Sequence, residues 1–381
     1  MTEFRFLYGP RLISGDNTSA DLSPLLPKGA VLFVTDAHVL GLGLADAAIE
    51  GLRATQRDVL IFDAVEADPS RATLEVVVAL GREGRVTGVV GFGGGSPMDV
   101  AKLAAYLIGG PDELDAIWGV DKTTGTGLPL VLVPTTAGTG SEATPVAIIT
   151  LPGDEKRGVS SPALIARHAV LDPVLTLDLP RAVSAATGMD AMVHAIEAYT
   201  SAHLKNPLSD MLAREALRLL TGNMLRVCEE PENKIARGAM LLGAHLAGVA
   251  FANAPVAAVH ALAYPLGARF HVPHGLSNVL MLPHVLGFNM PSAMPLYAEL
   301  GPIVDPALDE LGQQAKAAGL IEALRRMSIV TGMPQKLRDV GVDREDLGQL
   351  ASDAMLQDRL LGNNPRPMNE AQALQLYAAA L

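Results

Sequence analysis

An aspartate and a histidine lie four positions apart in the largely apolar segment GMDAMVHAIEAYTS, residues 188–201. On a helix, Asp190 and His194 would lie one above the other on one face, about one turn apart. A carboxylate and an imidazole in this arrangement form either a buried hydrogen-bonded pair or half of a metal site. The rest of the chain has to decide between these two interpretations.

Four of the nine histidines fall within 25 residues, in the segment VHALAYPLGARFHVPHGLSNVLMLPH; they are His260, His271, His274 and His284. Taken alone, His260 is more typical of a core histidine. Together with the Asp190–His194 pair, however, the cluster predicts a site of three imidazoles and one carboxylate. Neutral imidazole and carboxylate ligands suit a divalent metal such as Fe²⁺ or Zn²⁺. The spacing does not choose between His271 and His274.

A glycine-rich segment, VTGVVGFGGGSPMDVAK at residues 86–102, has the order strand, turn and helix. Ser96 is expected to be the N-cap, with Pro97 at the first helical position and Asp99 completing a capping box. The successive glycines Gly93 to Gly95 require a further reason. Because glycine lets the backbone approach a ligand and a helix N-terminus attracts anions, we predict that this turn binds phosphate.

Two other strand ends carry polar side chains. Asp36 ends the run AVLFVTD, residues 30–36, where an acid either accepts hydrogen bonds from an adenosine ribose or caps the next helix. This residue alone leaves both roles open. The loop VPTTAGTGSEATP, residues 133–145, is crowded with the hydroxyl groups of Thr135, Thr136, Thr139 and Ser141. Two loops of this kind on one sheet indicate a dinucleotide rather than a lone phosphate.

The elements that position these groups follow from the hydrophobic pattern, which differs between the two halves of the chain. Up to about residue 180, continuous apolar runs alternate with helical patterns; the runs cover residues 30–36, 58–64, 86–95 and 128–136. This alternation predicts a parallel sheet covered on both faces, and the later segments are helical in length and periodicity. We therefore expect an α/β dinucleotide-binding domain over 1–179 and an all-helical, metal- and substrate-binding domain over 180–381. LDLP at 177–180 is the expected hinge, and the active site is expected in the cleft between the domains.

The composition excludes several functions. A chain of 381 residues with 49% hydrophobic and 18% charged residues can bury two cores, and its net charge of −12 argues against a nucleic-acid partner. The single cysteine, Cys228, excludes an intrachain disulfide and a thiolate metal site. The segment MTEFRFLYGPRL lacks the pattern of a signal peptide, and no uninterrupted apolar run reaches the length of a membrane span. We expect a cytoplasmic globular protein that does not bind membranes.

Four segments carry a family resemblance: GFGGGSPMDVAK, PTTAGTGSEAT, GMDAMVHAIEAY and HALAYPLGARFHVPHGLSNVLMLPHV. In this order they resemble the iron-containing (group III) alcohol dehydrogenases, from about residue 4 to NNPRP near the C-terminus. The resemblance implies the dehydroquinate synthase-like fold, NAD as the cofactor, and Fe²⁺ or else Zn²⁺ as the metal. It implies hydride transfer between a metal-activated primary alcohol and the nicotinamide ring, with the aldehyde as the other substrate. It also implies a homodimer or a larger homo-oligomer.

The resemblance also implies roles for particular residues. The metal ligands that it implies are Asp190, His194, His260 and His274, so it chooses His274 over His271. The residues that it implies for cofactor binding are Asp36, Asp68, Gly94, Gly95, Ser96, Thr135, Thr136, Thr139, and Lys156 or Arg157. Among these, Asp36 is the acid that favours NAD over NADP.

Three positions depart from the family. Tyr264 stands where many members carry a second histidine thought to relay protons, and His271 offers a substitute relay. The expected substrate pocket is lined by Val146, Phe251 and Leu360. Two of these, Val146 and Leu360, replace more polar residues of some members. The less polar pocket weighs against a diol substrate.

Three alternatives stay open at this point. A maleylacetate-type or other reductase of a carboxylated carbonyl would keep the fold, but it would need a cationic clamp, and apart from Arg269 the helical domain shows no obvious arginine cluster near the histidines. A metallohydrolase would explain the histidines but not the two loops or Asp36. A non-catalytic nucleotide-binding protein would leave the histidines unexplained.

Overall fold

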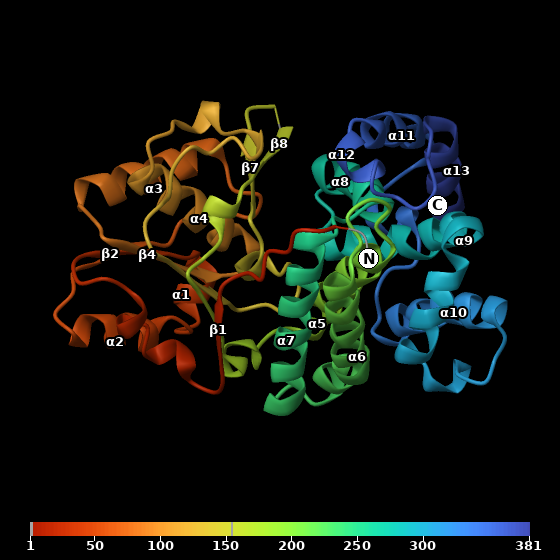
Figure 1. Ribbon diagram of the computed structural model, residues 1–381, viewed down its shortest axis with the longest axis horizontal. Helices are drawn as coiled ribbons and strands as arrows, with labels where there is room; N and C mark the ends of the chain where they lie inside the picture. Colours follow the sequence, from red (N-terminus) through yellow and green to blue (C-terminus); the bar gives the residue numbers. More distant parts are fainter. Residues whose placement is uncertain (1–2, 154) are drawn as a thin grey trace. The chain divides into compact units, whose positions relative to one another are not determined.

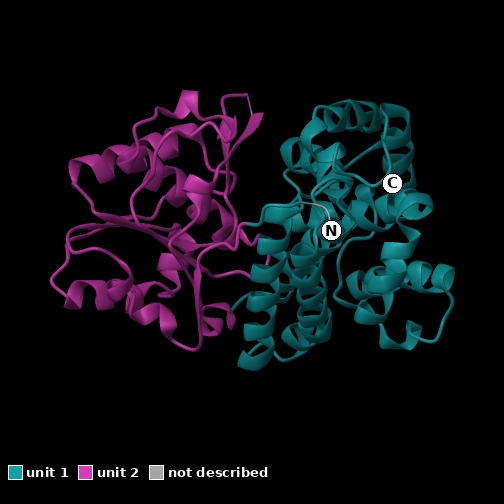
Figure 2. Cartoon of the chain, in the orientation of Figure 1, with its two compact units in different colours: residues 1–6, 178–381 teal, residues 7–177 magenta. Residues whose placement is uncertain are grey.

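The computed structural model describes residues 3–153 and 155–381, which form two compact units (Figure 2). The α/β unit comprises residues 7–177, and the helical unit comprises residues 3–6 and 178–381. The chain passes from one unit to the other within LDLP, residues 177–180. The sequence had placed this change at 179/180 and had not assigned the first residues to the helical unit.

Six parallel strands form the central sheet of the α/β unit, in the order β1-β9-β6-β4-β2-β3 (Figure 1). The strands are β1 (Arg11–Ser14), β2 (Val31–Val34), β3 (Val59–Phe62), β4 (Gly88–Gly93), β6 (Leu130–Pro134) and β9 (His168–Leu171). The four apolar runs of the sequence correspond to β2, β3, β4 and β6. The predicted parallel sheet is therefore confirmed, whereas β1 and β9 were not predicted.

Helices cover both faces of this sheet. They are α1 (Ala37–Gly41), α2 (Asp46–Ala54), α3 (Arg71–Glu83) and α4 (Gly95–Gly109). Side chains alternate along a strand, so Leu32 of β2 packs with residues of α3 and α4, and Phe33 packs with residues of α1 and α2. Figure 1 shows these two pairs of helices on opposite sides of the sheet. Since both faces are buried, every residue of β2 has to be apolar.

A second, smaller sheet extends the α/β unit. It contains β5 (Gly119–Val120), β7 (Val146–Leu151) and β8 (Glu155–Ser160), in the order β5-β8-β7. Strands β7 and β8 pair antiparallel. Ala147 and Ile149 of β7 and Val159 of β8 are fully buried in the core that α4 also lines. The sheet is thus held by alternate residues, while the intervening side chains of β8 remain partly or fully exposed.

The helical unit contains nine α-helices among its described residues: α5 (Arg181–Thr200), α6 (Pro207–Glu229), α7 (Lys234–Asn253), α8 (Ala258–Phe270), α9 (His274–Val304), α10 (Gln313–Val330), α11 (Leu347–Met355), α12 (Asp358–Leu361) and α13 (Glu370–Ala380). Helix α5 is the centre, because it packs against α6, α7 and α9. Every residue from 188 to 200 is buried. The predicted two-domain fold class, with a parallel sheet followed by helices, is confirmed.

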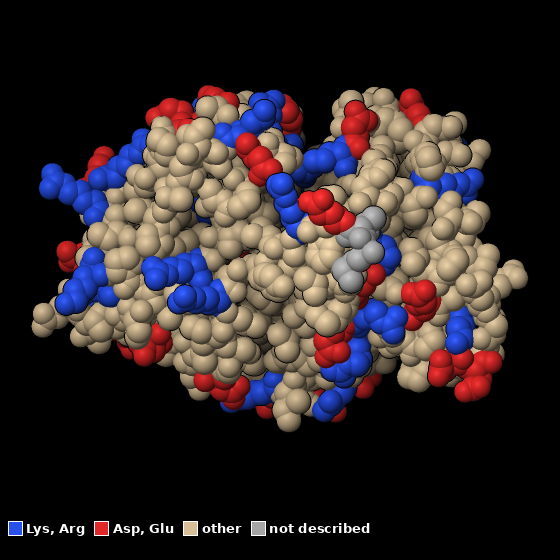
Figure 3. Space-filling model, viewed as in Figure 1, with Lys and Arg blue, Asp and Glu red and all other residues tan. Residues whose placement is uncertain are grey.

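Helix α7 is long and apolar enough to cross a membrane by length and composition, but 61% of the relevant stretch is buried inside the protein. A core helix of a globular protein has these same properties. On the face drawn in Figure 3, the basic and acidic side chains of the described residues are interspersed rather than gathered into separate areas.

Candidate metal and cofactor sites

One aspartate and three histidines of the helical unit converge on one point: Asp190, His194, His260 and His274. One donor atom from each lies within 4.8 Å of the others. Asp190 Oδ1 is 4.0 Å from the Nε2 of His194, 3.9 Å from that of His260 and 3.6 Å from that of His274. Metal bonds of about 2.1 Å in a tetrahedral site place ligand atoms about 3.4 Å apart. The donor atoms would have to approach one another by up to about 1.4 Å to close on a divalent ion, and their chemistry and convergence fit such a metal.

Helices α5 and α8 supply three of these side chains. Asp190 and His194 are one turn apart on α5, as their spacing predicts, and His260 lies in the first turn of α8. The rings of His194 and His260 stack with their centroids 4.8 Å apart. Each of these three residues is buried, with at most 5% of its surface exposed. The cluster is therefore part of the interior packing of the unit.

The fourth side chain depends on a close approach of two helices. His274 is the first residue of α9, and Gly275 follows it. A Cβ at Gly275 would lie 2.4 Å from the carbonyl oxygen of Ala186 and 3.3 Å from the Cβ of Asp190. Only glycine lets the start of α9 press against α5 at this distance. This contact brings His274, whose side chain is 41% exposed, against the buried carboxylate.

The charge of the cluster is set by Asp190. Burial alone would raise the pKa of this carboxyl, but the charge of the three facing histidines in their protonated form and the side-chain amide of Asn278 outweigh it and lower the pKa below its ordinary value. Asn278 Nδ2 donates a hydrogen bond to Asp190 Oδ1 at 2.6 Å. Asp190 is thus ionised at neutral pH, which is the state in which a carboxylate binds a metal.

Sequence reasoning missed Asn278 and a second residue beside the cluster, Glu197. Glu197 lies on α5 three positions after His194, and it is 3% exposed. Its carboxylate lies 2.6 Å from His260 Nδ1 and accepts hydrogen bonds from the backbone N–H groups of Ala257 and Val259. A signal was available, because a glutamate in the apolar run AIEAY follows the Asp190–His194 pair at helical spacing.

Two aromatic side chains pack against the clustered histidines. The ring of Phe251, on α7, lies 4.5 Å from that of His194, centroid to centroid. The ring of Tyr264, one turn after His260 on α8, lies 5.8 Å from that of His274. Both residues had been singled out from the sequence, and the structure brings both to the cluster.

Other predicted residues are not among the four clustered donors. His271 is exposed and ends α8 in a left-handed conformation, with φ of 52°. His284 lies farther along α9 and does not join the four donors. Leu360 is buried in α12, and Val146 begins β7 of the α/β unit. Arg269, the possible clamp for a carboxylated substrate, is instead paired with Asp353.

The start of α4 differs from its prediction. The helix begins at Gly95 with Gly94 as its N-cap, so the assignment of Ser96 as the N-cap is wrong. Asp99 does not complete a capping box. Its carboxylate instead accepts hydrogen bonds from the Ser141 hydroxyl at 2.6 Å and the Ile148 N–H at 3.0 Å. The N-terminal N–H groups of α4 therefore have no side-chain cap, and they lie at the glycine turn.

The structure brings the glycine turn and the hydroxyl-rich loop together. Strands β4 and β6 are neighbours in the sheet, and the Thr135 N–H donates to the Gly93 carbonyl at 2.9 Å. A Cβ at Gly95 would lie 3.0 Å from the Cγ2 of Thr139, and one at Gly94 would lie 3.9 Å from the hydroxyl oxygen of Thr136. Both loops follow the carboxyl ends of parallel strands, where α/β proteins bind nucleotides.

Asp36 takes one of the two roles that the sequence left open, that of a helix cap. It is the N-cap of α1, and its Oδ1 accepts a hydrogen bond from the Val39 N–H at 2.8 Å. Its other oxygen, Oδ2, lies 3.3 Å from the position that a Cβ on Gly93 would take. The second oxygen therefore faces the glycine turn.

The remaining predicted cofactor residues lie at the surface of the α/β unit. Asp68 is exposed, with φ of 55°, and its carboxylate pairs with Lys156 Nζ at 2.6 Å. Arg157 pairs with Glu155 and lies over the ring of Trp118, at 5.8 Å from its centroid. The structure brings Asp68 and Lys156 together but gives Arg157 other partners.

A buried lysine fastens the hydroxyl-rich loop to α4. Lys102 is 1% exposed, and its Nζ donates to the Ser141 hydroxyl at 2.7 Å and to the Val146 carbonyl at 2.7 Å. Burial lowers the pKa of this ammonium below its ordinary value, although Asp99 and Glu142 oppose the shift. The sequence analysis did not identify this network.

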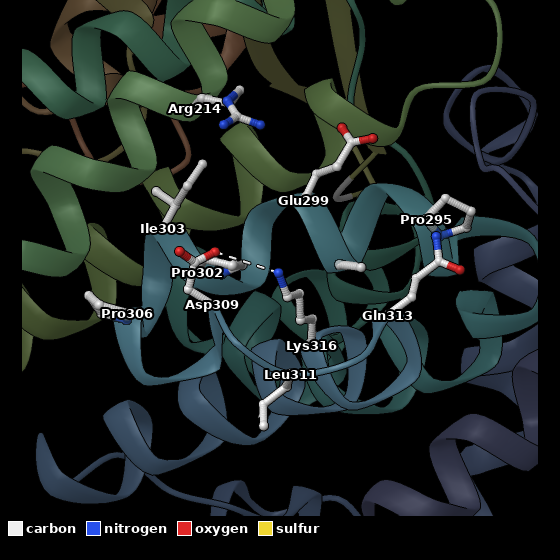
Figure 4. Close-up of a pocket in the computed structure, with 11 residues that line it drawn as sticks. Arg214, Pro295, Glu299, Pro302, Ile303, Pro306, Asp309, Leu311, Gln313 and Lys316 are labelled. Atoms are coloured by element: carbon white, nitrogen blue, oxygen red, sulfur yellow. Dashed lines mark ion pairs between the residues drawn. The ribbon is translucent and has the colours of Figure 1, made fainter.

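A hollow of about 570 Å³ lies in another part of the helical unit, among α6, α9 and α10 (Figure 4). Its lining carries both charges, and Lys316 Nζ lies 3.5 Å from Asp309 Oδ1. Among the described residues, none of the four clustered donors lines this hollow. It is therefore distinct from the candidate metal site.

Known proteins match both halves of the chain. Residues 9–173 match the family model of iron-containing alcohol dehydrogenase, and residues 184–381 match that of the C-terminal region of the Fe-containing alcohol dehydrogenase family. The chain is 38% identical over 353 residues to Long-chain-alcohol dehydrogenase 1 of Geobacillus thermodenitrificans (strain NG80-2). The matched region covers 92% of this chain and 89% of that protein. The chain belongs to the iron-containing alcohol dehydrogenase family.

Solved structures agree with this assignment. A 1,3-propanediol oxidoreductase is 33% identical and superposes with a TM-score of 0.96, covering 100% of both chains. Sulfoacetaldehyde reductase from Bifidobacterium kashiwanohense, solved in complex with NAD⁺, is 25% identical, with a TM-score of 0.88 and coverage of 100% of this chain and 99% of that one.

The family match settles the class of this protein. Members of the family use NAD together with iron or another divalent metal, and they act on alcohols and aldehydes. The chain is an NAD-dependent alcohol dehydrogenase. The predicted family, enzyme class and cofactors are confirmed, and the match does not favour the metallohydrolase, the non-catalytic nucleotide-binding protein or the carboxylated-carbonyl reductase.

Proposed function

We propose that Asp190, His194, His260 and His274 hold the divalent metal of this alcohol dehydrogenase. The observation that carries this proposal is the convergence of one carboxylate and three imidazole nitrogens within 4.8 Å. Helix α5 places Asp190 in the interior, and on metal binding the three histidines would donate as neutral imidazoles. When bound, the metal supplies Lewis acidity at the alcohol oxygen, while NAD accepts the hydride.

The glycine turn and the hydroxyl-rich loop form the proposed cofactor site. Gly94, Gly95 and Ser96 present the N-terminus of α4 to the diphosphate, because backbone N–H groups there lack partners and attract anions. The nicotinamide half is proposed to lie beside the threonine side chains of the second loop, namely Thr135, Thr136 and Thr139. Asp36 is proposed to accept a hydrogen bond from the ribose, and Asp68 with Lys156 or Arg157 to contact the cofactor.

The proposed substrates are apolar primary alcohols and the corresponding aldehydes. Phe251 and Tyr264 pack against two of the proposed ligand rings, and we infer that they exclude water from the reacting oxygen. Val146 and Leu360 add apolar surface where some relatives are more polar. Similarity to a protein named Long-chain-alcohol dehydrogenase 1 supports the same direction. We assign packing to Tyr264, and a proton relay to His271.

The test is to remove single imidazoles. His274→Ala and His260→Ala should each lose bound metal and turnover, measured by metal analysis and by NADH formation from a primary alcohol. NADH binding, followed by nicotinamide fluorescence, should largely survive, because the cofactor loops belong to the other unit. His271→Ala is the matched control and should keep its metal. If His274→Ala keeps full metal occupancy while His271→Ala loses it, the ligand assignment is wrong.

The protein is further proposed to work in the cytoplasm as a homodimer or a larger homo-oligomer. Its one cysteine, Cys228, is buried and unpaired by disulfide, which is compatible with a reducing compartment. Light scattering coupled to size-exclusion chromatography measures the assembly, and a monomer at all concentrations would contradict this part of the proposal.

A further inference from the structure

Glu197 is a buried carboxylate, and both of its oxygens accept hydrogen bonds. It is 3% exposed, so an uncompensated charge there would be costly. Oε1 accepts from the Val259 N–H at 2.7 Å, and Oε2 accepts from the Ala257 N–H at 2.9 Å and lies 2.6 Å from His260 Nδ1. All three partners belong to the start of α8. The carboxylate therefore serves this one helix end.

The neighbours of both ring nitrogens assign the hydrogen of the His260 ring. Asn278 Nδ2 is an amide donor and lies 3.2 Å from His260 Nε2, so Nε2 is the acceptor and Nδ1 is the nitrogen that donates to Glu197. Nε2 is then left with its lone pair, and this atom lies 3.9 Å from Asp190 Oδ1 within the donor cluster. A histidine that gives its other N–H to a carboxylate is held in one orientation and is a more basic metal ligand.

The backbone contacts add a second effect. The N–H groups of Ala257 and Val259 lie at the N-terminus of α8, where N–H groups have no partner within the helix. By accepting both, Glu197 ties α8 to α5, the helix that carries Asp190 and His194. One side chain thus sets the direction of one donor ring and its distance from two other donors.

We propose that Glu197 is a positioning residue of the metal centre, which holds His260 Nε2 toward the ion and thereby raises the affinity for a divalent transition metal. It contacts neither the substrate nor the cofactor in this proposal. The inference rests on the proposed metal site, and it adds a residue for which the charge and reach of the carboxylate are both required.

The test measures metal affinity rather than turnover. Glu197→Gln should bind Zn²⁺ and Co²⁺ about 10- to 100-fold more weakly than the wild type in competition with a chelator, because the amide cannot serve all three donors. The rise of the melting temperature on adding metal should shrink accordingly. Glu299→Gln is the control, since Glu299 also accepts a hydrogen bond within the helical unit, from the hydroxyl of Tyr199. It should keep wild-type affinity.

A second variant protects the test against misfolding. Glu197→Asp keeps the charge but shortens the side chain by one methylene, and it should also bind metal more weakly and change the visible spectrum of bound Co²⁺. If either variant lowers the melting temperature of the metal-free protein but leaves the metal affinity at the wild-type value, Glu197 only caps α8 and the proposal is overturned.

A double mutant separates this failure from failure of the metal site. In a His260→Ala background, Glu197→Gln should cause no further loss of the residual Zn²⁺ affinity, because its effect passes through the absent ring. A further tenfold loss would show that Glu197 acts through the scaffold, against the proposal. If His260→Ala itself binds metal as the wild type does, the proposed ligand set fails first.

Discussion

Replacing Asp36 by glycine should move the cofactor preference of this enzyme from NAD toward NADP. In the structure, Oδ1 of Asp36 caps α1 through the Val39 N–H, and Oδ2 lies 3.3 Å from a Cβ position on Gly93. A nucleotide whose diphosphate lies at the glycine turn would bring its adenosine ribose to this second oxygen. The ribose hydroxyl of NAD would gain a charged acceptor, whereas the 2′-phosphate of NADP would meet a like charge.

The size of the effect follows from these two interactions. A hydrogen bond to a charged group contributes about 1.5–3 kcal/mol, so its loss should weaken NAD by about 10- to 150-fold. Two like charges about 5 Å apart at an effective dielectric constant of about 20 repel by about 3 kcal/mol. Asp36 is only half-buried, so screening by solvent reduces this repulsion. The NAD/NADP preference should still fall by at least about 100-fold.

The assay compares kcat/KM for NAD and for NADP with one primary alcohol. Asp36→Asn is the informative control, because asparagine caps a helix as well as aspartate but carries no charge. It should relieve the NADP penalty and retain more of the NAD activity than Asp36→Gly. Glycine at the cap should cost only a few tenths of a kcal/mol of stability. If both variants keep the wild-type ratio within about threefold, Asp36 is a helix cap only and the ribose assignment is wrong.

Two further substitutions test the packing around the sites. Tyr264→Phe should keep most of kcat with a long-chain primary alcohol, whereas Tyr264→His should favour small polar alcohols. The measurement is kcat against pH for both variants and for His271→Ala. If Tyr264→Phe is a hundredfold slower while metal and NADH binding are intact, the hydroxyl takes part in the chemistry. Lys102→Met should lower the melting temperature by about 5 °C or more and weaken NADH, because charged hydrogen bonds to the hydroxyl-rich loop are lost. Lys28→Met, at an exposed lysine, is the control, and an equal loss in both variants would contradict the role of Lys102.

The central strands could be predicted because strands buried on both faces appear in the sequence as continuous apolar runs. Leu32 and Phe33 are adjacent in sequence but face different cores, so the whole run has to be apolar. Strand β8 leaves no such trace. Its sequence EKRGVS is mostly polar, and it forms a strand because β7 pairs with it antiparallel. Such pairing is a tertiary property, which is why the small sheet was missed.

The start of α4 could not be read correctly from local rules. The pattern Ser96–Pro97–x–Asp99 satisfies every local requirement of a helix cap. The carboxylate of Asp99, however, is used by Ser141 and by the backbone of Ile148, which lies 49 positions farther along the chain. A contact of that sequence separation overrides the local motif, and it is invisible until β7 is placed.

Only part of the donor cluster could be predicted from local patterns. The helical period alone places Asp190 beside His194, but it does not say where α8 ends. The structure ends α8 at His271 in a left-handed conformation and starts α9 at His274, so the first ring is exposed and the second meets Asp190. The path of the chain between α8 and α9, rather than the sequence spacing, determines which of these two histidines joins the cluster.

The composition of α5 gives a physical reason for assigning its two buried carboxylates to the proposed metal site. Every residue from 188 to 200 is buried, and a helix buried all round is expected to be apolar. Thr200 satisfies its own hydroxyl by donating to the Ile196 carbonyl at 2.9 Å. Asp190 and Glu197 have no such local solution and instead direct their carboxylates to groups on other helices. Burying two acids costs free energy that apolar side chains would not cost, so their presence is explained by what they hold in place.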